Sequence, residues 1–194
     1  MKRISRHQTT GPESGFTLIE LLVSMGLAVL VLLVVGGFMI SSSHTERDVR
    51  SATEASTAGQ LVVRSVQAGV RNASRVALTE ISDEQMLVVR TAGGGTPVEW
   101  ACQAWYYVPE GGGTLYMKRV APAVKIEPPT AVELDSWTLL ADGISMTNTK
   151  IFEAILGRVT IKLDVDGGPL GAVSINSTAT MRILPNTEPK CFEE

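Results

Sequence analysis

One uninterrupted apolar run near the N-terminus constrains the fold more than any other feature of the sequence. It extends from Phe16 to Ile40, and Glu20 is its only charged residue. A helix of this length rises about 37 Å at 1.5 Å per residue. That is enough to cross a hydrocarbon core about 30 Å thick. We therefore expect a transmembrane helix, with Leu18 to Ile40 as the spanning segment.

The single acid in this run has an energetic cost. A carboxylate at the bilayer centre costs about 2.5–3.5 kcal/mol on insertion scales. Glu20 is therefore either an acid tolerated at the interface or a group that needs a partner. Lys2, Arg3 and Arg6 precede the run. The positive-inside rule places that end in the cytoplasm and the rest of the chain outside.

Length and charge limit the kind of domain that the rest of the chain can form. The chain has 194 residues, so the part beyond residue 40 is long enough for one domain with a modest core. Its 17 basic and 20 acidic residues give a formal charge of −3. A general nucleic-acid binder would carry a basic excess. We expect no nucleic-acid contact for this protein.

Residues 41–75 have the pattern of an amphipathic helix. Apolar residues recur at three- and four-residue steps, and the opposite face is polar. No proline interrupts residues 16–96. We predict one helix from Phe16 to about Arg75, whose second half offers one stripe to a globular head. The stripe consists of Ala55, Gly59, Val62, Val66, Val70, Ala73 and Val76.

Residues 76–194 have the pattern of a β-rich head. Alternating segments are separated by turns rich in glycine and proline. We predict an α+β fold in which an antiparallel sheet of about five to seven strands wraps on the second half of the helix. The expected strands are 85–91, 98–108, 114–120, 136–146, 158–165 and 172–184.

Two cysteines, Cys102 and Cys191, lie in the part expected outside the cytoplasm. A single pair in an oxidising compartment favours one disulfide, which would tie the C-terminal tail to a central strand. Two separate free thiols are the alternative.

The sequence lacks the residues of a common catalytic or metal site. His44 is the only histidine after residue 15, so a histidine triad or a multi-histidine metal site is not expected. The stretch from Asp164 to Gly167 is similar to part of a calcium loop, but the later ligands are missing, which favours a hairpin turn. The aromatic cluster of Trp100, Trp105 and the neighbouring tyrosines is typical of side chains that pack in a core or on the face of a sheet. We expect no catalytic residue, no metal and no cofactor.

The hexapeptide from Gly15 to Glu20, followed by the apolar run, resembles the class III signal of type IV pilins and pseudopilins. The resemblance implies that a prepilin peptidase cuts between Gly15 and Phe16 and methylates the new N-terminus at Phe16. Residues 1–15 are then a cleaved leader, and the remaining chain has 14 basic and 19 acidic residues. It also implies that Glu20 pairs with the Phe16 amine of a neighbouring subunit during assembly on an inner-membrane platform.

The C-terminal part carries a second resemblance. The stretch from Trp137 to Ile144, and later Met181 to Ile183, look like the larger minor pilins and the J-type minor pseudopilins. Many members of the family have a proline where this chain has Gly37. The pair Gly36 and Gly37 could soften the helix or allow close helix packing, and the sequence leaves both open.

These observations favour a non-enzymatic structural subunit that is held in the cytoplasmic membrane and then assembled into a type IV pilus or a type II secretion pseudopilus. A subunit of a DNA-uptake pilus is an alternative within the family. A bitopic membrane protein with an uncut leader and an outer ligand-binding or enzymatic domain is an alternative of another class. Fibre type, place in the fibre and any ligand of the head are not set by the sequence.

Overall fold

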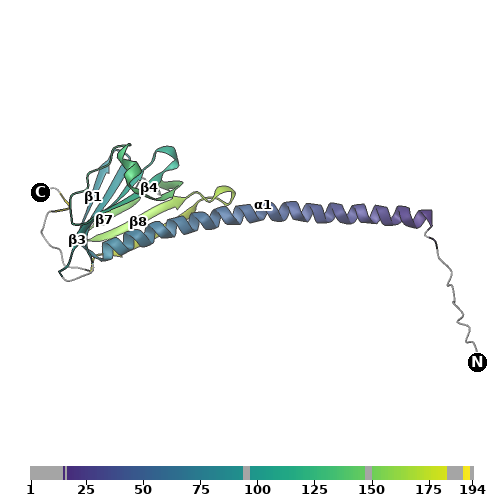
Figure 1. The fold of residues 1–194 in the computed structure, drawn as a ribbon, viewed down its shortest axis with the longest axis horizontal. Helices are drawn as coiled ribbons and strands as arrows, with labels where there is room; N and C mark the ends of the chain where they lie inside the picture. Colours follow the sequence, from purple (N-terminus) through teal and green to yellow (C-terminus); the bar gives the residue numbers. More distant parts are fainter. Residues whose placement is uncertain (1–14, 16, 94–96, 147–149, 183–189, 193–194) are drawn as a thin grey trace, which may run out of the picture. The chain divides into compact units, whose positions relative to one another are not determined.

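The computed structural model describes residues 15, 17–93, 97–146, 150–182 and 190–192. Its contacts divide the chain into two compact units, Met1–Glu46 and Arg47–Glu194. One helix, α1, extends from Leu18 to Arg71, and the second unit contains the β-strands (Figure 1). A long N-terminal helix that packs on antiparallel sheets is the predicted α+β, pilin-like fold.

The end of α1 differs from the prediction. The helix ends at Arg71, four residues before Arg75, and strand β1 begins at Ala73. Ala73 and Val76 were expected on the helical stripe, but both lie in β1. Their spacing fits a helix as well as the preceding residues do. The chain leaves the helix because β1 forms an antiparallel ladder with β2, which has one register shift between Ala73 and Arg75, and Ala92 N–H donates to Asn72 O at 3.3 Å.

The strands form two antiparallel sheets in the described part of the chain. The first has the order β1-β2-β3-β4-β5, and in the second β8 pairs with β6, β7 and β9. The first sheet consists of β1 (Ala73–Ile81), β2 (Glu84–Ala92), β3 (Trp100–Val108), β4 (Thr114–Val120) and β5 (Thr138–Asp142). The second consists of β6 (Ile144–Met146), β7 (Phe152–Ile155), β8 (Arg158–Val165) and β9 (Val173–Thr180).

The predicted single sheet of five to seven strands is therefore wrong in both number and arrangement. Two strands, β1 and β7, had not been predicted, and the segment expected from 136 to 146 contains two strands that belong to different sheets. Gly143, with φ of +65°, turns the chain between them. The two predicted hairpins, β3–β4 and β8–β9, are present with regular registers. Residues 183 and 184 of the last predicted strand lie outside the described residues.

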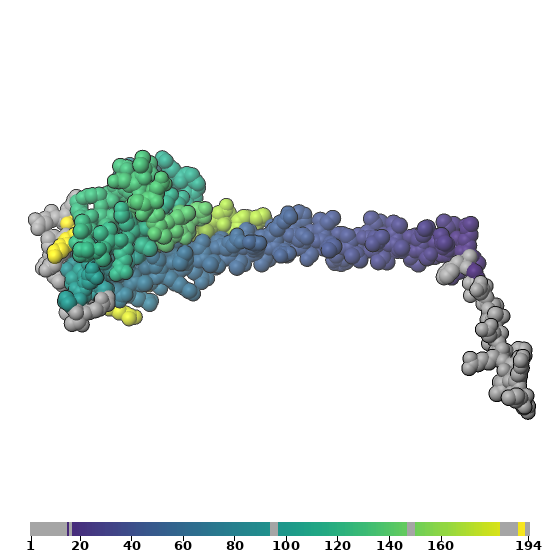
Figure 2. All heavy atoms as spheres, viewed as in Figure 1, coloured from purple at the N-terminus to yellow at the C-terminus, as the bar shows by residue number. Residues whose placement is uncertain are grey.

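The second half of α1 and both sheets share one core. From the outside, this half of the helix lies along the β-rich part of the chain (Figure 2). Val62, Val66 and Val70 are fully buried against it. Gly59 and Gly69 allow the strands to approach α1 closely. A Cβ built on Gly59 would lie 2.2 Å from Ile175 Cδ1, and one on Gly69 would lie 2.2 Å from Trp105 Cη2. Trp105 is held in place because its Nε1–H donates to Ser65 Oγ at 2.9 Å.

Polar groups join the two sheets. Gln85 is buried on β2, and its Oε1 accepts from the N–H groups of Ile151 and Phe152 at 2.8 and 3.0 Å. At another contact, Ile144 N–H donates to Gly113 O at 2.9 Å, and the Tyr107 hydroxyl donates to Ile144 O at 3.1 Å. These bonds satisfy backbone groups where the sheets meet, so the sheets are tied together by more than apolar packing.

A second core lies on the other face of the first sheet. It includes Ala104, Tyr106, Ile126 and Trp137. Cys102 and Cys191 belong to it and form a disulfide across a separation of 89 residues, so the pairing expected from the sequence is present. The bridge fastens the C-terminal segment to β3. The described cysteines include no free thiol.

Candidate functional site

The candidate site is the N-terminal segment, beginning at the expected cleavage position. Gly15 is exposed, and a Cβ built there would meet nothing within 4 Å. Phe16, the expected site of methylation, lies outside the described residues, as does the leader before Gly15. Of the two residues that flank the expected cleavage bond, the structure therefore describes only Gly15.

Thr17 caps the N-terminal end of α1. Its carbonyl accepts from the N–H groups of Glu20 and Leu21 at 3.1 and 3.2 Å, and its Oγ1 accepts from Glu20 N–H at 3.4 Å. A threonine cap followed three residues later by glutamate is the pattern of a capping box. The sequence reasoning missed this role of Thr17, although Thr-x-x-Glu before an apolar run is itself a recognisable signal.

Glu20 therefore lies in the first turn of α1, where it is the acidic residue closest to the helix start. An acid in the first turn interacts favourably with the helix dipole, typically by about 0.3–1 kcal/mol at exposed sites. Its side chain is exposed, and it forms no ion pair with any described residue. The local helix end offsets part of the cost of the acid.

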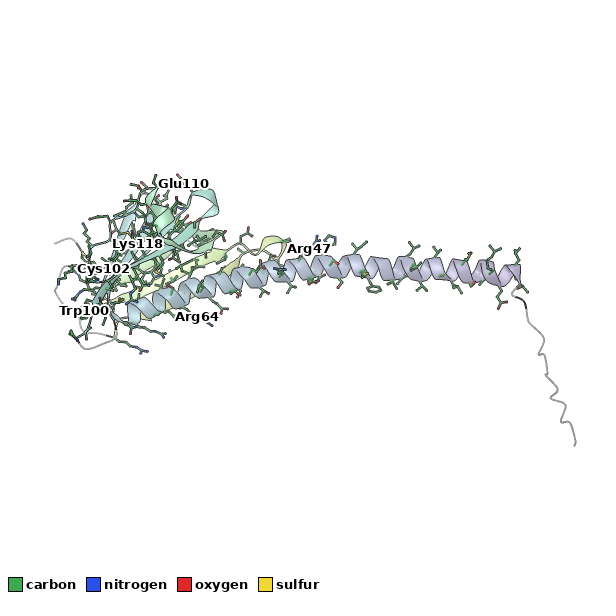
Figure 3. The ribbon with its side chains drawn as sticks, viewed as in Figure 1. Arg47, Arg64, Trp100, Cys102, Glu110 and Lys118 are labelled. Carbon is green, nitrogen blue, oxygen red and sulfur yellow. A yellow bond between two sulfur atoms is a disulfide. The ribbon has the colours of Figure 1, made fainter. Side chains whose placement is uncertain are left out.

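The apolar segment after Glu20 presents a continuous hydrophobic surface. Side chains project from both visible sides of this part of the helix (Figure 3), and its large apolar residues are exposed. Leu22 is 60% exposed and Leu33 is 68% exposed. By length and composition, α1 qualifies as a helix that can cross a membrane. A surface of this kind needs lipid or other apolar helices around it.

Gly36 and Gly37 lie within α1, which is assigned as helix throughout this part. A Cβ built on either glycine would meet nothing within 4 Å. Both positions therefore have free space beside the helix backbone.

The other residues considered for chemistry have structural surroundings. His44 is exposed on α1. Asp166 Oδ1 accepts from Gly168 N–H at 2.8 Å, which closes the turn before β9. Among the described residues, no group of three acidic, histidine or cysteine side chains could hold a metal ion.

The aromatic residues of β3 take the alternating orientation that the sequence predicts. Trp105 and Tyr107 face the helix-side core, whereas Tyr106 faces the second core. Burial raises the pKa of both tyrosine hydroxyls, and for Tyr106 the hydrogen bond to Glu84 raises the pKa further. Both hydroxyls therefore stay protonated and act as donors in ordinary conditions, as structural groups do.

The geometry agrees with the comparison of the sequence with known families. A family profile described as the prokaryotic N-terminal methylation motif matches residues 12–36. The chain carries a prepilin-type N-terminus. No curated protein and no solved structure matches the chain.

The matched residues contain Gly15, the Thr17 cap, Glu20 and most of the apolar segment. The match ends at Gly36, so it does not extend to the β-rich unit. The chain thus combines an N-terminal methylation motif with a fold of one long helix on antiparallel sheets.

Proposed function

We propose that this protein is a minor pilin or minor pseudopilin, a structural subunit that is cut by a prepilin peptidase and assembled into a surface or periplasmic fibre. The observation that carries the proposal is the coincidence of the methylation motif at residues 12–36 with an exposed apolar helix. The motif supplies the processing signal, and the helix supplies a surface that must be covered. No catalytic residue takes part.

The proposed sequence of events begins in the cytoplasmic membrane. Residues 18–40 span the bilayer, with the leader in the cytoplasm and the β-rich head outside. The peptidase hydrolyses the bond between Gly15 and Phe16, and the new amine of Phe16 is methylated. An assembly platform in the inner membrane then transfers the helix from lipid to the helices of other subunits.

Glu20 couples processing to assembly in this proposal. Its carboxylate has no ionic partner among the described residues, and a carboxylate in an apolar fibre core requires a counter-charge. Cleavage creates a free amine at Phe16, which the precursor lacks. Pairing of Glu20 with the amine of a neighbouring subunit would align the two helices.

Mass spectrometry of the mature N-terminus tests the proposal directly. We expect a chain that begins with methylated Phe16. A chain that keeps Met1 would contradict the proposal and favour a bitopic membrane protein with a permanent anchor.

Substitution of Gly15 by a bulky residue is the matched genetic test. Gly15→Trp should leave a full-length precursor in the membrane. Gly26→Trp changes another exposed glycine of the N-terminal unit and should still be cleaved. Normal maturation of the Gly15 variant would place the cleavage elsewhere.

A further inference from the structure

The turn between β7 and β8 presents two large apolar side chains to solvent. Ile155 is 69% exposed and Leu156 is 101% exposed. Both belong to the β-rich unit, most of whose apolar strand residues are buried in two cores, although Leu139 of β5 is 55% exposed. Neither side chain belongs to these cores, so packing among the described residues does not account for them.

The backbone at Leu156 is also unfavourable for leucine. Ile155 pairs with Arg158, so Leu156 and Gly157 are the two central residues of a tight turn. Their φ angles are +47° and +76°. Such turns usually contain Asn-Gly or Gly-Gly. The left-handed conformation costs a residue with a side chain about 1–2 kcal/mol. A strained and fully exposed leucine indicates a role outside the folding of this chain.

Three arginines are connected to the turn through the backbone. Arg158 follows Gly157 directly, and Gly157 O accepts from Met181 N–H at 3.0 Å. The next residue, Arg182, donates its N–H to Arg71 O at 3.4 Å. The side chains of Arg71, Arg158 and Arg182 are all exposed, and within the described part of the chain none of them forms an ion pair.

The outer face of the sheet beside the turn has a shallow hollow of about 360 Å³. The hollow is lined by the guanidinium of Arg158 and the hydroxyls of Thr160 and Thr180. Its apolar side is formed by Ile155 and Leu156. Glu153 also lines it, but its carboxylate is 3.1 Å from Lys162 Nζ. The hollow therefore combines hydrogen-bond donors for an anion with an apolar margin.

We propose that the β7–β8 turn docks onto a membrane surface that contains anionic phospholipids. Ile155 and Leu156 would enter the interface, and the three arginines would contact phosphate headgroups. Convex, fully exposed apolar side chains suit a soft interface better than a rigid protein surface, which would need a matching pocket. Nucleic-acid phosphates could use the arginines but would leave Leu156 in water. The proposal does not depend on cleavage after Gly15.

The test must separate this contact from the insertion of α1 into lipid. We would place the full chain in nanodiscs of neutral phosphatidylcholine, so that α1 is already embedded. Binding of these nanodiscs to immobilised vesicles is then measured. One set of vesicles contains phosphatidylcholine only, and the other contains about 30% phosphatidylglycerol. We expect binding to the anionic vesicles, weakened by salt, and little binding to the neutral ones.

Two variants address the two parts of the contact. Leu156→Asn removes the apolar side chain and suits the left-handed backbone, so the fold should be kept; binding should fall about tenfold. Arg158→Ser should weaken binding about fivefold, the effect expected for one basic residue near an anionic surface. Leu170→Asn and Arg47→Ser are matched controls, because both side chains are exposed and belong to other elements of the same unit. Figure 3 labels Arg47 on α1. Both should bind like the wild type.

Several results would overturn the proposal. Equal binding to neutral and anionic vesicles would exclude headgroup recognition. Wild-type binding by Leu156→Asn would exclude insertion of the turn, and an equal loss in Leu170→Asn would exclude specificity for it. Capture of duplex DNA that falls in Arg158→Ser but not in Leu156→Asn would assign the arginines to nucleic acid instead.

Discussion

At the residue scale, one substitution can separate two possible roles of Glu20. Its side chain stands at the glutamate position of a capping-box pattern that begins at Thr17, and it is the acid proposed to pair with a neighbouring amine. Glutamine can also occupy this capping position. Glu20→Gln should therefore keep the helix start and lose the ionic pair.

We expect the Glu20→Gln variant to be cleaved normally and to be incorporated poorly into fibres, as Glu20→Ala would be. The measurement compares the amount of variant in sheared fibres with the amount of processed protein in the membrane. If the glutamine variant enters fibres like the wild type whereas the alanine variant does not, the capping function alone explains the acid.

Gln85 is the residue on which the contact between the sheets depends most directly. Its Oε1 satisfies two backbone N–H groups, and its amide group donates to Phe152 O at 3.4 Å. Gln85→Leu would leave these buried groups without partners. Each such group costs about 1–3 kcal/mol, so the free energy of unfolding should fall by at least about 2 kcal/mol.

Denaturant unfolding followed by tryptophan fluorescence would measure this loss. Gln103→Leu is the matched control, since Gln103 lies on the adjacent strand and makes no hydrogen bond through its side chain with the described residues. Its effect should stay within about 0.5 kcal/mol, as for most substitutions of this kind. Equal losses of unfolding free energy in the two variants would show that Gln85 stabilises the unit by side-chain packing and not by its hydrogen bonds.

At the element scale, the contact between α1 and the first sheet depends on a missing side chain. Gly69 faces Trp105, whose indole is fully buried and hydrogen-bonded to Ser65. Alanine favours a helix over glycine by about 0.5–1 kcal/mol. Overpacking of a rigid core usually costs about 1–3 kcal/mol. Because the indole cannot retreat easily, we expect overpacking to exceed the helix preference.

Gly69→Ala should therefore lower the unfolding free energy of the β-rich unit by about 1–2 kcal/mol. Gly36→Ala is the control, because a Cβ there has free space, and it should leave this transition unchanged. Stabilisation by the Gly69 substitution would mean that Trp105 moves at little cost. Gly36 and Gly37 stand out in the sequence because they interrupt the apolar run. The contact of Gly69 could not be predicted in the same way, because its partner Trp105 lies on a strand 36 residues later.

The elements that the sequence predicted are those with a strong local pattern. In β8, Val159, Ile161 and Leu163 alternate with polar residues, and the structure buries all three. Strand β1 lacks this alternation, and its burial falls gradually from one end to the other. Strand β7 has only four residues. Both strands form because β2 and β8 provide pairing partners. The local sequence pattern of a segment does not show whether such a partner is present.

The same distinction applies to the candidate site. The motif and its position predicted Gly15, Phe16 and Glu20 together, because processing depends on a short contiguous segment. The exposed turn at Ile155 and Leu156 had no such signal. Leu-Gly is an unusual pair for a tight turn, so its significance appears only when the φ angles and exposure are known.

At the scale of the whole molecule, the two units have different requirements. The N-terminal unit exposes an apolar surface that needs lipid or partner helices, whereas the β-rich unit has its own two cores. The second core depends on the C-terminal segment. There Cys191 bonds to Cys102, and Phe192 stacks under Arg75 with a distance of 4.7 Å from Cζ to the ring centroid. The disulfide therefore fastens the last part of the chain over a face of the first sheet.

Removal of this bridge should destabilise the β-rich unit strongly. In the chain-entropy model, closing a loop of this length contributes about 4 kcal/mol to the free energy of unfolding. The double variant Cys102→Ala, Cys191→Ala should show a loss of this size in denaturant unfolding. Reduction of the wild type should give a similar loss, and the reductant should not affect the double variant, which serves as the control.

The redox state in cells links this bridge to the proposed orientation. If the head lies outside the cytoplasm, both thiols should be oxidised and resist alkylation of the intact protein until a reductant is added. A variant with the basic leader residues Lys2, Arg3 and Arg6 replaced by glutamate should retain more heads in the reducing cytoplasm, where the thiols become accessible to alkylation after denaturation. Thiols that remain reduced in the wild type would contradict the orientation, since the buried pair lies at bonding distance and would be expected to oxidise outside.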